Sequence, residues 1–426
     1  MSDRWISGIV FAELSDVGMR RANNQDSFAC LPAKTEERFW NRGHLFVVAD
    51  GMGAHAAGEL ASRMATESIA MHYFRSSHPD SIEALRTAVA EANEEIHQRG
   101  QNNPEFHNMG TTASSLAILA SGAVVAHVGD SRVYRLRDDM LEQLTFDHSL
   151  VWEMEASGHK DGGAFGQNIP RNVITRSLGP NASVDIDVEG PFPVEKGDRF
   201  LICSDGLTGL VEDAEIGTLM DCLPEDLAVR VLVDLANLRG GPDNTTVVIV
   251  RVDQDPPDGP RAAKAKRRRG DPPVSPVMLA TTLVCCVGAA ALGLLQQWGP
   301  MVVAIILGLV AAVVSLGQFL KNRNSMTAQP VAKGGKGPYR RYNAAPTSEL
   351  YKRLGGTVQA LRDAATDKNW MMDWKKVDEF QRQGSNALKQ KDPKRAIRFQ
   401  AEAIIETMNQ LREQNNRAAN ETAIDQ

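Results

Sequence analysis

The stretch "LFVVADGMGAHAAGE", residues 45–59, joins an apolar run directly to a carboxylate and then to glycines, a histidine and other small residues. A strand followed by an Asp-Gly turn is the ordinary explanation of such a pattern. A functional carboxylate at Asp50 explains it equally well, so the rest of the chain must distinguish the two.

Four further acids stand at the margins of expected strands. They are Asp26 in "GMRRANNQDSF", Asp130 in "AHVGDSRVYRL", Asp205 in "RFLICSDGL" and Asp243 in "GPDNTTVVIVRV". Each of them, taken alone, is more readily a turn or cap residue. Five carboxylates at the edges of one core, however, repel one another and resist the loss of water. Together with Asp50 they therefore predict a shared divalent cation.

The ligand types indicate which cation this is. Carboxylates, a backbone carbonyl such as that of Gly51, and waters favour Mg²⁺ or Mn²⁺, whereas zinc favours His and Cys clusters that this chain lacks. Two such ions can activate a bridging water and hold phosphate oxygens. Arg21 is the natural bidentate phosphate ligand. The pattern thus predicts hydrolysis of a phosphate ester.

Other phosphate chemistries lack their motifs. None of the five cysteines is followed by Arg six positions later, as a cysteine-nucleophile phosphatase requires. A P-loop and the kinase motifs are also missing. The net charge of -6 gives no reason to expect nucleic acid. The cysteine spacings and the N-terminus fit a reducing compartment and no secretory signal.

Residues 1–253 read as one unit with strands and helices. Expected strands are 45–49, 112–119, 123–128, 133–136, 200–203 and 245–252, and expected helices are 58–74, 81–99 and 225–238. The Gly-rich segment 158–171 is expected to be a loop or flap. A basic and proline-containing linker, 254–273, follows the unit.

Two uncharged apolar runs, 274–295 and 301–320, each have about the length that spans a bilayer as a helix. Only "QQWGP", residues 296–300, separates them, and basic residues flank the pair on both outer sides. We expect a transmembrane hairpin in the cytoplasmic membrane, with both terminal regions in the cytoplasm. Helices buried in a large core are the alternative, and the basic run before 274 has a second interpretation as a nucleic-acid or localisation patch.

A flexible linker is expected over 321–347, and a cytosolic helical region over 348–426. Small residues at Gly384, Ala396 and Ala403 suit a single tetratricopeptide-type unit, and a plain helical hairpin or coiled coil fits equally well. We expect this region to dock a protein partner or control self-association, and its deletion to leave peptide turnover unchanged.

In order along the chain, "GMRRANNQD", "VVADGMGAHAAGE", "MGTTASSLAIL", "AHVGDSRVYRL", "LTFDHSLV", "RNVITRSLG", "FLICSDGL" and "GPDNTTVVIV" resemble the motifs of the bacterial metal-dependent serine/threonine protein phosphatases of type 2C. The resemblance covers about residues 7–253. It implies an α+β fold, a four-layer sandwich of two antiparallel β-sheets flanked by helices. Phosphorylated proteins would be the substrates and a Ser/Thr kinase the opposing enzyme.

The resemblance also implies roles for single residues. Asp50 would bridge two Mn²⁺ or Mg²⁺ ions and Gly51 would offer its carbonyl, while Asp205 and Asp243 would complete the centre. Three more positions have implied roles: Asp26 would act through bound water, Asp130 would help to hold a third, weaker ion, and His55 would lie near the phosphate with Arg21.

Two departures from the family pattern stand out. Ala54 replaces a glycine before His55, and the segment before "RNVITRSLG" lacks the usual His-Pro, which leaves the specificity of the flap open. A phosphoprotein-binding scaffold and a hydrolase of small phosphoesters remain alternatives to a protein phosphatase.

Overall fold

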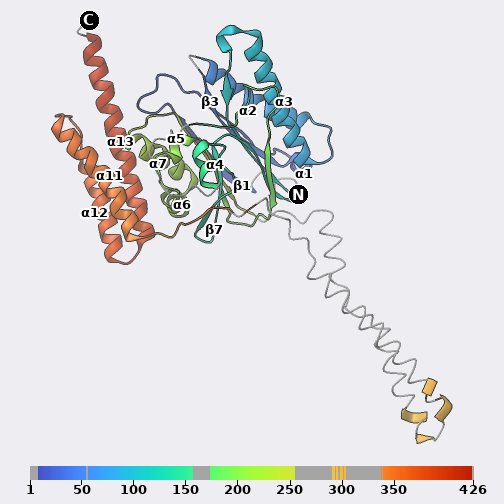
Figure 1. The fold of residues 1–426 in the computed structure, drawn as a ribbon. Helices are drawn as coiled ribbons and strands as arrows, with labels where there is room; N and C mark the ends of the chain where they lie inside the picture. The colour runs from blue at the N-terminus through green and yellow to red at the C-terminus, as the bar shows by residue number, and fades with distance from the viewer. Residues whose placement is uncertain are drawn as a thin grey trace. The chain divides into compact units, whose positions relative to one another are not determined.

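The computed structural model describes residues 8–53, 56–156, 173–254 and 339–424, with Gly337 and short pieces between 290 and 303. The chain divides into two compact units. One comprises residues 1–256 together with 334–426, and the other comprises 257–333 (Figure 1). The C-terminal region therefore belongs to the same unit as the residues that precede the apolar runs.

Two antiparallel β-sheets form the centre of the first unit. The first sheet contains, in spatial order, β1 (Ile9–Asp16), β11 (Thr245–Val252), β10 (Arg199–Cys203), β7 (Arg132–Arg137), β8 (Met140–Gln143) and β12 (Arg341–Asn343). The second contains β2 (Asp26–Leu31), β3 (His44–Met52), β5 (Ala113–Leu119), β6 (Gly122–Val128) and β9 (Asp187–Phe192), with β4 (Gly110–Thr111) paired to β3.

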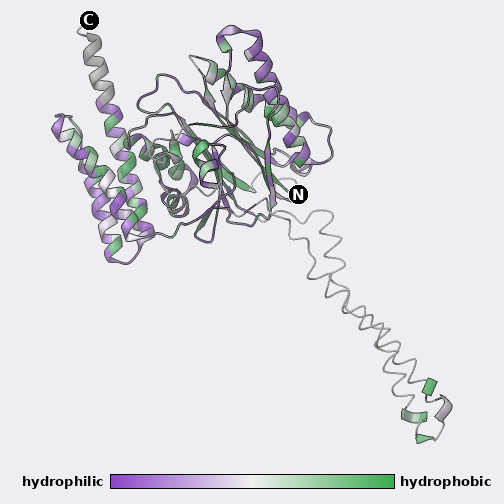
Figure 2. Ribbon diagram, in the orientation of Figure 1, coloured by the Kyte–Doolittle hydropathy of each residue, from purple (hydrophilic) through white to green (hydrophobic). Residues whose placement is uncertain are grey.

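The two sheets face each other across a continuous apolar core. Phe46 and Val48 of β3 meet Phe200 and Val248 of the opposite sheet there, and all four are fully buried. Because side chains alternate along a strand, the next residue of each strand faces outward and is covered by helices. This explains why these strands are apolar on both faces. Figure 2 colours much of the central strands as hydrophobic.

Helices cover the outer face of each sheet. The β2–β3 sheet carries α2 (Ala57–Arg75) and α3 (Ser81–Asn102), which pack along each other (Figure 1). The other sheet carries α6 (Asp213–Cys222) and α7 (Glu225–Leu238). Shorter helices are α1 (Glu36–Arg42), η1 (Pro104–Phe106), α4 (Leu150–Ala156) and α5 (Asp205–Thr208). The expected four-layer sandwich of two antiparallel sheets is confirmed.

Most of the expected elements are present. The six predicted strands correspond to β3, β5, β6, β7, β10 and β11, and the three predicted helices to α2, α3 and α7. The strands that were not predicted include β9, "DVEGPF", and β12, "RYN". Both are short and polar and lie at sheet edges, so neither carries the alternation that marks a half-buried strand.

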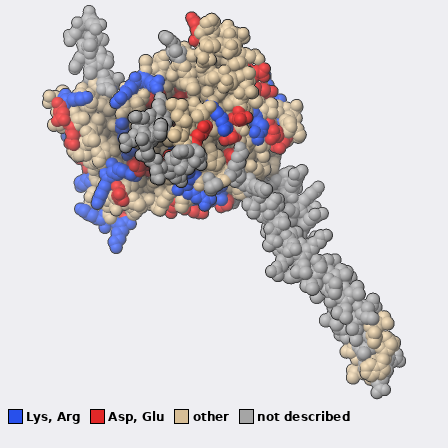
Figure 3. Space-filling model, viewed as in Figure 1, with Lys and Arg blue, Asp and Glu red and all other residues tan. Residues whose placement is uncertain are grey.

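The C-terminal region forms α11 (Ser348–Asp367), α12 (Lys375–Lys389) and α13 (Pro393–Ile424). α12 and α13 pack against each other as a helical hairpin. Gly384 of α12 permits close packing against α11, since a Cβ there would lie 2.8 Å from Tyr351 of α11. Figure 3 shows Lys and Arg side chains on the lower left of the first unit, where these helices lie in Figure 1.

The C-terminal region packs into the first unit and does not form a separate tail. Leu354 and Val358 of α11 and Ile397 of α13 share one buried cluster with Leu219 of α6 and Leu232 of α7. The linker expected over 321–347 is wrong for its last residues, because β12 and the buried Ala344 lie inside it. Pairing with the edge of a sheet orders a segment whose composition indicates flexibility.

The apolar runs 274–295 and 301–320 lie almost wholly outside the described residues. Within the described part of the chain, none of the helices combines the length and the apolar character needed to cross a bilayer. The flap expected over 158–171 also lies outside the described residues.

Candidate active site

The five acids come from both sheets and meet at one end of the sandwich. Asp50, near the end of β3, is directly opposite Asp26 at the start of β2. Asp205 begins α5 immediately after β10, and Asp243 stands just before β11. Asp130 lies in the connection from β6 to β7. The strands β3, β10 and β11 contact one another across the core, which brings these positions together.

The electrostatics of Asp50 show how close the acids are. Burial raises the pKa of its carboxyl well above the usual range, and Asp26, Asp205, Asp130 and Asp243 raise it further. The four other acids are therefore close enough to interact with Asp50, and Asp26 and Asp130 are buried whereas the Asp243 side chain is 35% exposed. The sequence predicted such a gathering from the positions of the acids at strand ends.

Burial likewise raises the pKa of Asp26 to about 7, against the hydrogen bonds that its Oδ2 accepts from Thr246 (2.7 Å) and Ser204 (2.8 Å). Burial also raises the pKa of Asp130 to about 7, with Asp205 as the next cause. For Asp205 the pKa is raised by burial first and by Asp243 second. Carboxyls in this state hold protons unless a cation offsets their charge.

The oxygen atoms left unpartnered fit a hard cation. Among the described residues, Oδ1 of Asp26 and Oδ1 of Asp130 are buried and have no hydrogen-bond partner. No three His, Cys, Asp or Glu side chains of the described part already converge in a metal-binding group. An all-oxygen set of this kind suits Mg²⁺ or Mn²⁺.

Local structure fixes Asp50 and Gly51. The Asp50 amide donates to Oγ1 of Thr112 (2.9 Å), and Oγ1 of Thr111 donates to the Asp50 carbonyl (2.9 Å). Gly51 donates its amide to the Gln25 carbonyl (3.0 Å). A Cβ at Gly51 would lie 2.1 Å from the carbonyl oxygen of Gly58, so only glycine fits.

Arg21 lies at the rim of the acid cluster. Its Nη2 donates to Oδ2 of Asp243 at 2.8 Å, and its Nε donates to the Pro242 carbonyl at 3.3 Å. Its side chain is 47% exposed, so the guanidinium reaches both the acids and solvent. A cation in this position can receive a phosphate whose ester faces outward.

Asn244 was not predicted and organises the Arg21 loop. Its Oδ1 accepts from the Gln25 amide (2.8 Å), and its Nδ2 donates to the carbonyls of Val17 (2.9 Å) and Asn23 (3.0 Å). The only signal in the sequence is that Asn244 follows Asp243 before a buried strand. Its role depends on contacts with residues more than 200 positions away, which local patterns cannot show.

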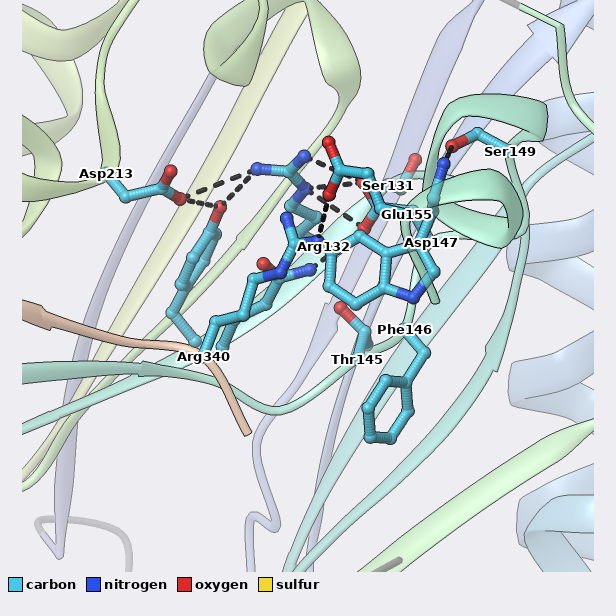
Figure 4. A network of polar contacts seen from close by, with 12 residues as sticks. Ser131, Arg132, Thr145, Phe146, Asp147, Ser149, Glu155, Asp213 and Arg340 are labelled. Carbon is cyan, nitrogen blue, oxygen red and sulfur yellow. Dashed lines mark hydrogen bonds and ion pairs between the residues drawn. The ribbon is translucent and has the colours of Figure 1, made fainter. Parts of the chain in front are cut away.

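The Asp130 side of the site rests on a buried ion pair. Arg132 donates from Nε to both carboxylate oxygens of Asp147 (3.0 and 2.9 Å) and from Nη2 to Oδ2 (2.7 Å) (Figure 4). Tyr134 donates to Oδ1 of Asp213 at 2.5 Å in the same network. A pocket of about 440 Å³ adjoins this network and includes Asp130 and Asp205 in its lining.

His55 and Ala54 lie outside the described residues.

Five acids gathered at one end of the sandwich, with an arginine at their rim, suit a metal-dependent phosphate hydrolase. The chain belongs to the protein phosphatase 2C family, whose model matches residues 19–227. It is a Ser/Thr protein phosphatase, and enzymes of this family use Mn²⁺ or Mg²⁺. Membership favours an enzyme over the phosphoprotein-binding scaffold.

Similar proteins that carry the name of phosphatases support membership of this family. Protein phosphatase PhpP of Streptococcus pneumoniae is 35% identical over 249 residues, which cover 57% of this chain and 97% of that protein. Serine/threonine phosphatase stp of Listeria innocua is 33% identical, over 55% of this chain and 93% of the relative. A solved S. agalactiae serine/threonine phosphatase is 34% identical with a TM-score of 0.51, and covers 57% of this chain and 100% of its own.

Proposed function

We propose that this chain is a membrane-anchored protein phosphatase that removes phosphate from Ser and Thr of cytosolic proteins and opposes a Ser/Thr kinase. The single observation that carries the catalytic part is the gathering of four carboxyls around Asp50, whose pKa Asp26, Asp205, Asp130 and Asp243 all raise. Kinase opposition follows from the reaction, since a phosphatase acts on what a kinase has made.

Each site residue then has a role. Asp50 would bridge two ions, Asp205 and Asp243 would complete their ligands, and the Gly51 carbonyl would bind one of them. Asp26 would act through bound water, consistent with the two hydroxyl donors that already occupy its Oδ2. Asp130 would hold a third, weaker ion with Asp205. The chemistry that bound Mn²⁺ or Mg²⁺ supplies is a water of lowered pKa and positive charge beside the phosphate.

The chain's own residues bind and orient the substrate. Arg21 would hold phosphate oxygens through its outward-facing guanidinium, and Asp243 keeps that guanidinium at the rim. His55 would assist phosphate binding or proton transfer. The buried floor of the site excludes bulk water from the carboxyls, which strengthens every charge interaction there.

Membrane anchoring rests on the two uncharged runs, 274–295 and 301–320. The compact unit that contains residues both before and after these runs bears on their topology. If one folded unit includes both flanks, both flanks must lie on the same side of any bilayer that the runs cross. A two-helix hairpin satisfies this requirement, and a single span does not. The C-terminal helices would then face the cytoplasm and remain available to a protein partner.

The catalytic proposal is tested with the full chain in detergent. Phosphate release from a phosphothreonine peptide should require Mn²⁺ or Mg²⁺, and turnover independent of any divalent ion would contradict it. Anchoring is tested in cells with a membrane-impermeant thiol reagent. Gln297→Cys, in the external loop, should be labelled, and Lys352→Cys, on α11, should not exceed the background of the parent chain. Labelling of Lys352→Cys would refute the topology.

A further inference from the structure

The segment 339–344, which we call the strap, attaches the C-terminal region to the edge of the first sheet. Its β12 pairs antiparallel with β8, with Tyr342 opposite Leu141. Two backbone hydrogen bonds flank the pair: the Gln143 amide donates to the Arg340 carbonyl (2.9 Å), and the Ala344 amide donates to the Asp139 carbonyl (2.8 Å). The strap therefore holds a fixed register on β8.

The side chain of Arg340 leaves the strap toward α4. Its guanidinium carbon lies 3.5 Å from the centroid of the Trp152 ring, and its Nη2 donates to Oε2 of Glu155 at 2.6 Å (Figure 4). Trp152 and Glu155 lie on the same helix, about one turn apart. One arginine thus contacts two successive turns of α4 by stacking and by an ion pair.

Tyr339 provides a second anchor beside the first. Its ring stacks on Phe146 with the centroids 5.6 Å apart, and its hydroxyl donates to Oε2 of Glu189 at 2.5 Å. Phe146 in turn meets the edge of Trp152 at 6.1 Å. The strap therefore contacts both α4 and Phe146, the residue that precedes Asp147.

These contacts connect the strap, through Gln143 and Asp147, to the residues next to Asp130. Gln143, whose amide is held by the Arg340 carbonyl, donates its Nε2 to Oδ1 of Asp147 (2.9 Å). Asp147 forms the ion pair with Arg132, two residues after Asp130. Arg340 and Trp152 also line the pocket of about 440 Å³ that Asp130 and Asp205 share. Arg340, which follows the apolar runs in the sequence, therefore holds one wall of this pocket.

We propose that Arg340 is a positioning residue for substrate recognition, and that this pocket binds the polypeptide flanking a phosphoserine or phosphothreonine. The inference rests on the proposed function for the adjacent carboxylates. Arg340 acts by fixing Trp152 and Glu155 as a wall of the pocket. The lining combines an aromatic ring, an aliphatic Val151 and the hydroxyl of Ser149 with charged groups, a mixture that suits peptide side chains and backbone.

The proposal separates two kinds of substrate. A small phosphoaryl ester occupies the phosphate site and does not extend into the pocket, whereas a phosphothreonine peptide does. Loss of Arg340 should therefore weaken peptide binding while chemistry at the phosphate is retained. We expect Arg340→Ala in the full chain to raise KM for the peptide about tenfold, with kcat within about twofold and both constants for the ester unchanged.

Two further variants test the mechanism of positioning. Arg340→Lys keeps the charge but loses the planar stack on Trp152, so the peptide KM should rise by an intermediate amount. Glu155→Gln removes the ion pair and retains the shape, and should raise the peptide KM less than Arg340→Ala. Because both act on one wall, the double variant Arg340→Ala/Glu155→Gln should be no worse than Arg340→Ala alone.

Arg353→Ala is the matched control, since Arg353 also joins the C-terminal region to the catalytic layers, through Glu212 (2.6 Å) and Glu215 (3.0 Å), but does not line the pocket. It should leave the peptide KM unchanged even if its melting temperature falls. An unchanged peptide KM in Arg340→Ala would overturn the proposal, as would equal losses for ester and peptide in both arginine variants. Absence of any Mn²⁺-dependent ester turnover in the parent chain is a distinct result, which contradicts the proposed function itself.

Discussion

Asp26 and Asp50 lie directly opposite each other in the antiparallel pair of β2 and β3. Like charges at such a position destabilise a sheet, and here both side chains are also buried or nearly so. A fold keeps this arrangement only where something else offsets the cost. A divalent cation shared by the two strands and by Asp205 and Asp243 would do so, and the pair would then couple stability to metal binding.

The first prediction concerns pH and metal. In the metal-free folded chain the pKa of Asp26 is about 7, whereas in the unfolded chain it is about 4. Its contribution to stability is thus fully present below about pH 4 and is lost as pH rises through about 7. A cation replaces the proton, so saturating Mn²⁺ should raise the melting temperature more at about pH 7.5 than at about pH 5.5.

Scanning calorimetry at the two pH values checks this, and Asp26→Asn serves as the matched variant. Because an amide does not titrate, the variant should show a weaker pH dependence in the absence of metal. An Mn²⁺ effect that is the same at both pH values would contradict the coupling.

A second prediction concerns Asp50. Asp50→Asn keeps the shape of the side chain but removes the charge that would bridge two ions, so kcat should fall at least about 100-fold. Asp138→Asn, in the turn between β7 and β8, is the control, because Asn tolerates the positive φ of 49° at that position. The rate of phosphate release at saturating Mn²⁺ distinguishes the two variants. Retained activity in Asp50→Asn would show that the site is wrongly assigned.

Arg21 carries a third prediction. Its ion pair with Asp243 is largely exposed and contributes about 0–1 kcal/mol to stability, so Arg21→Ala should melt close to the parent chain. Its kcat/KM should nevertheless fall by about 10- to 100-fold through loss of the bidentate phosphate contact, and Arg21→Lys should be intermediate. Arg20→Ala, at the adjacent exposed position, provides the control. A parallel loss in Arg20→Ala would point to disruption of the loop instead.

The fourth prediction tests whether the C-terminal helices unfold with the catalytic layers. Leu354 is fully buried in the cluster that α11 shares with α6 and α7. Leu354→Ala should lower the free energy of unfolding by about 2–4 kcal/mol, within a single urea transition. Lys352→Ala, exposed on the same helix, should change it little. Two separate transitions, with activity lost only in the second, would indicate an independent C-terminal unit.

The strands that bear the acids could be predicted because each combines an apolar run with an abrupt charged end. Residues 45–49 and 245–252 are of this kind, and the structure extends or reproduces both as β3 and β11. The acids themselves could be predicted for the same reason, since a carboxylate at the edge of a core is costly and therefore informative.

Asn244 and Arg340 could not be predicted, because their roles depend on distant partners. Asn244 binds a loop near the N-terminus, and Arg340 lies in a polar, glycine-containing stretch that indicates a linker by composition. The expectation that deletion of the C-terminal region leaves peptide turnover unchanged has a structural argument against it. Removal would expose Leu219 and Leu232, which share a buried cluster with α11 and α13.

The pairing of β12 with β8 has a consequence for the order of events during synthesis. The ribosome completes β8 and both apolar runs before it produces the strand that covers this edge. Until then β8 offers unpaired amide and carbonyl groups to any passing strand, a recognised route to misassociation. The nascent phosphatase layers therefore reach their final form only after both apolar runs have been synthesised.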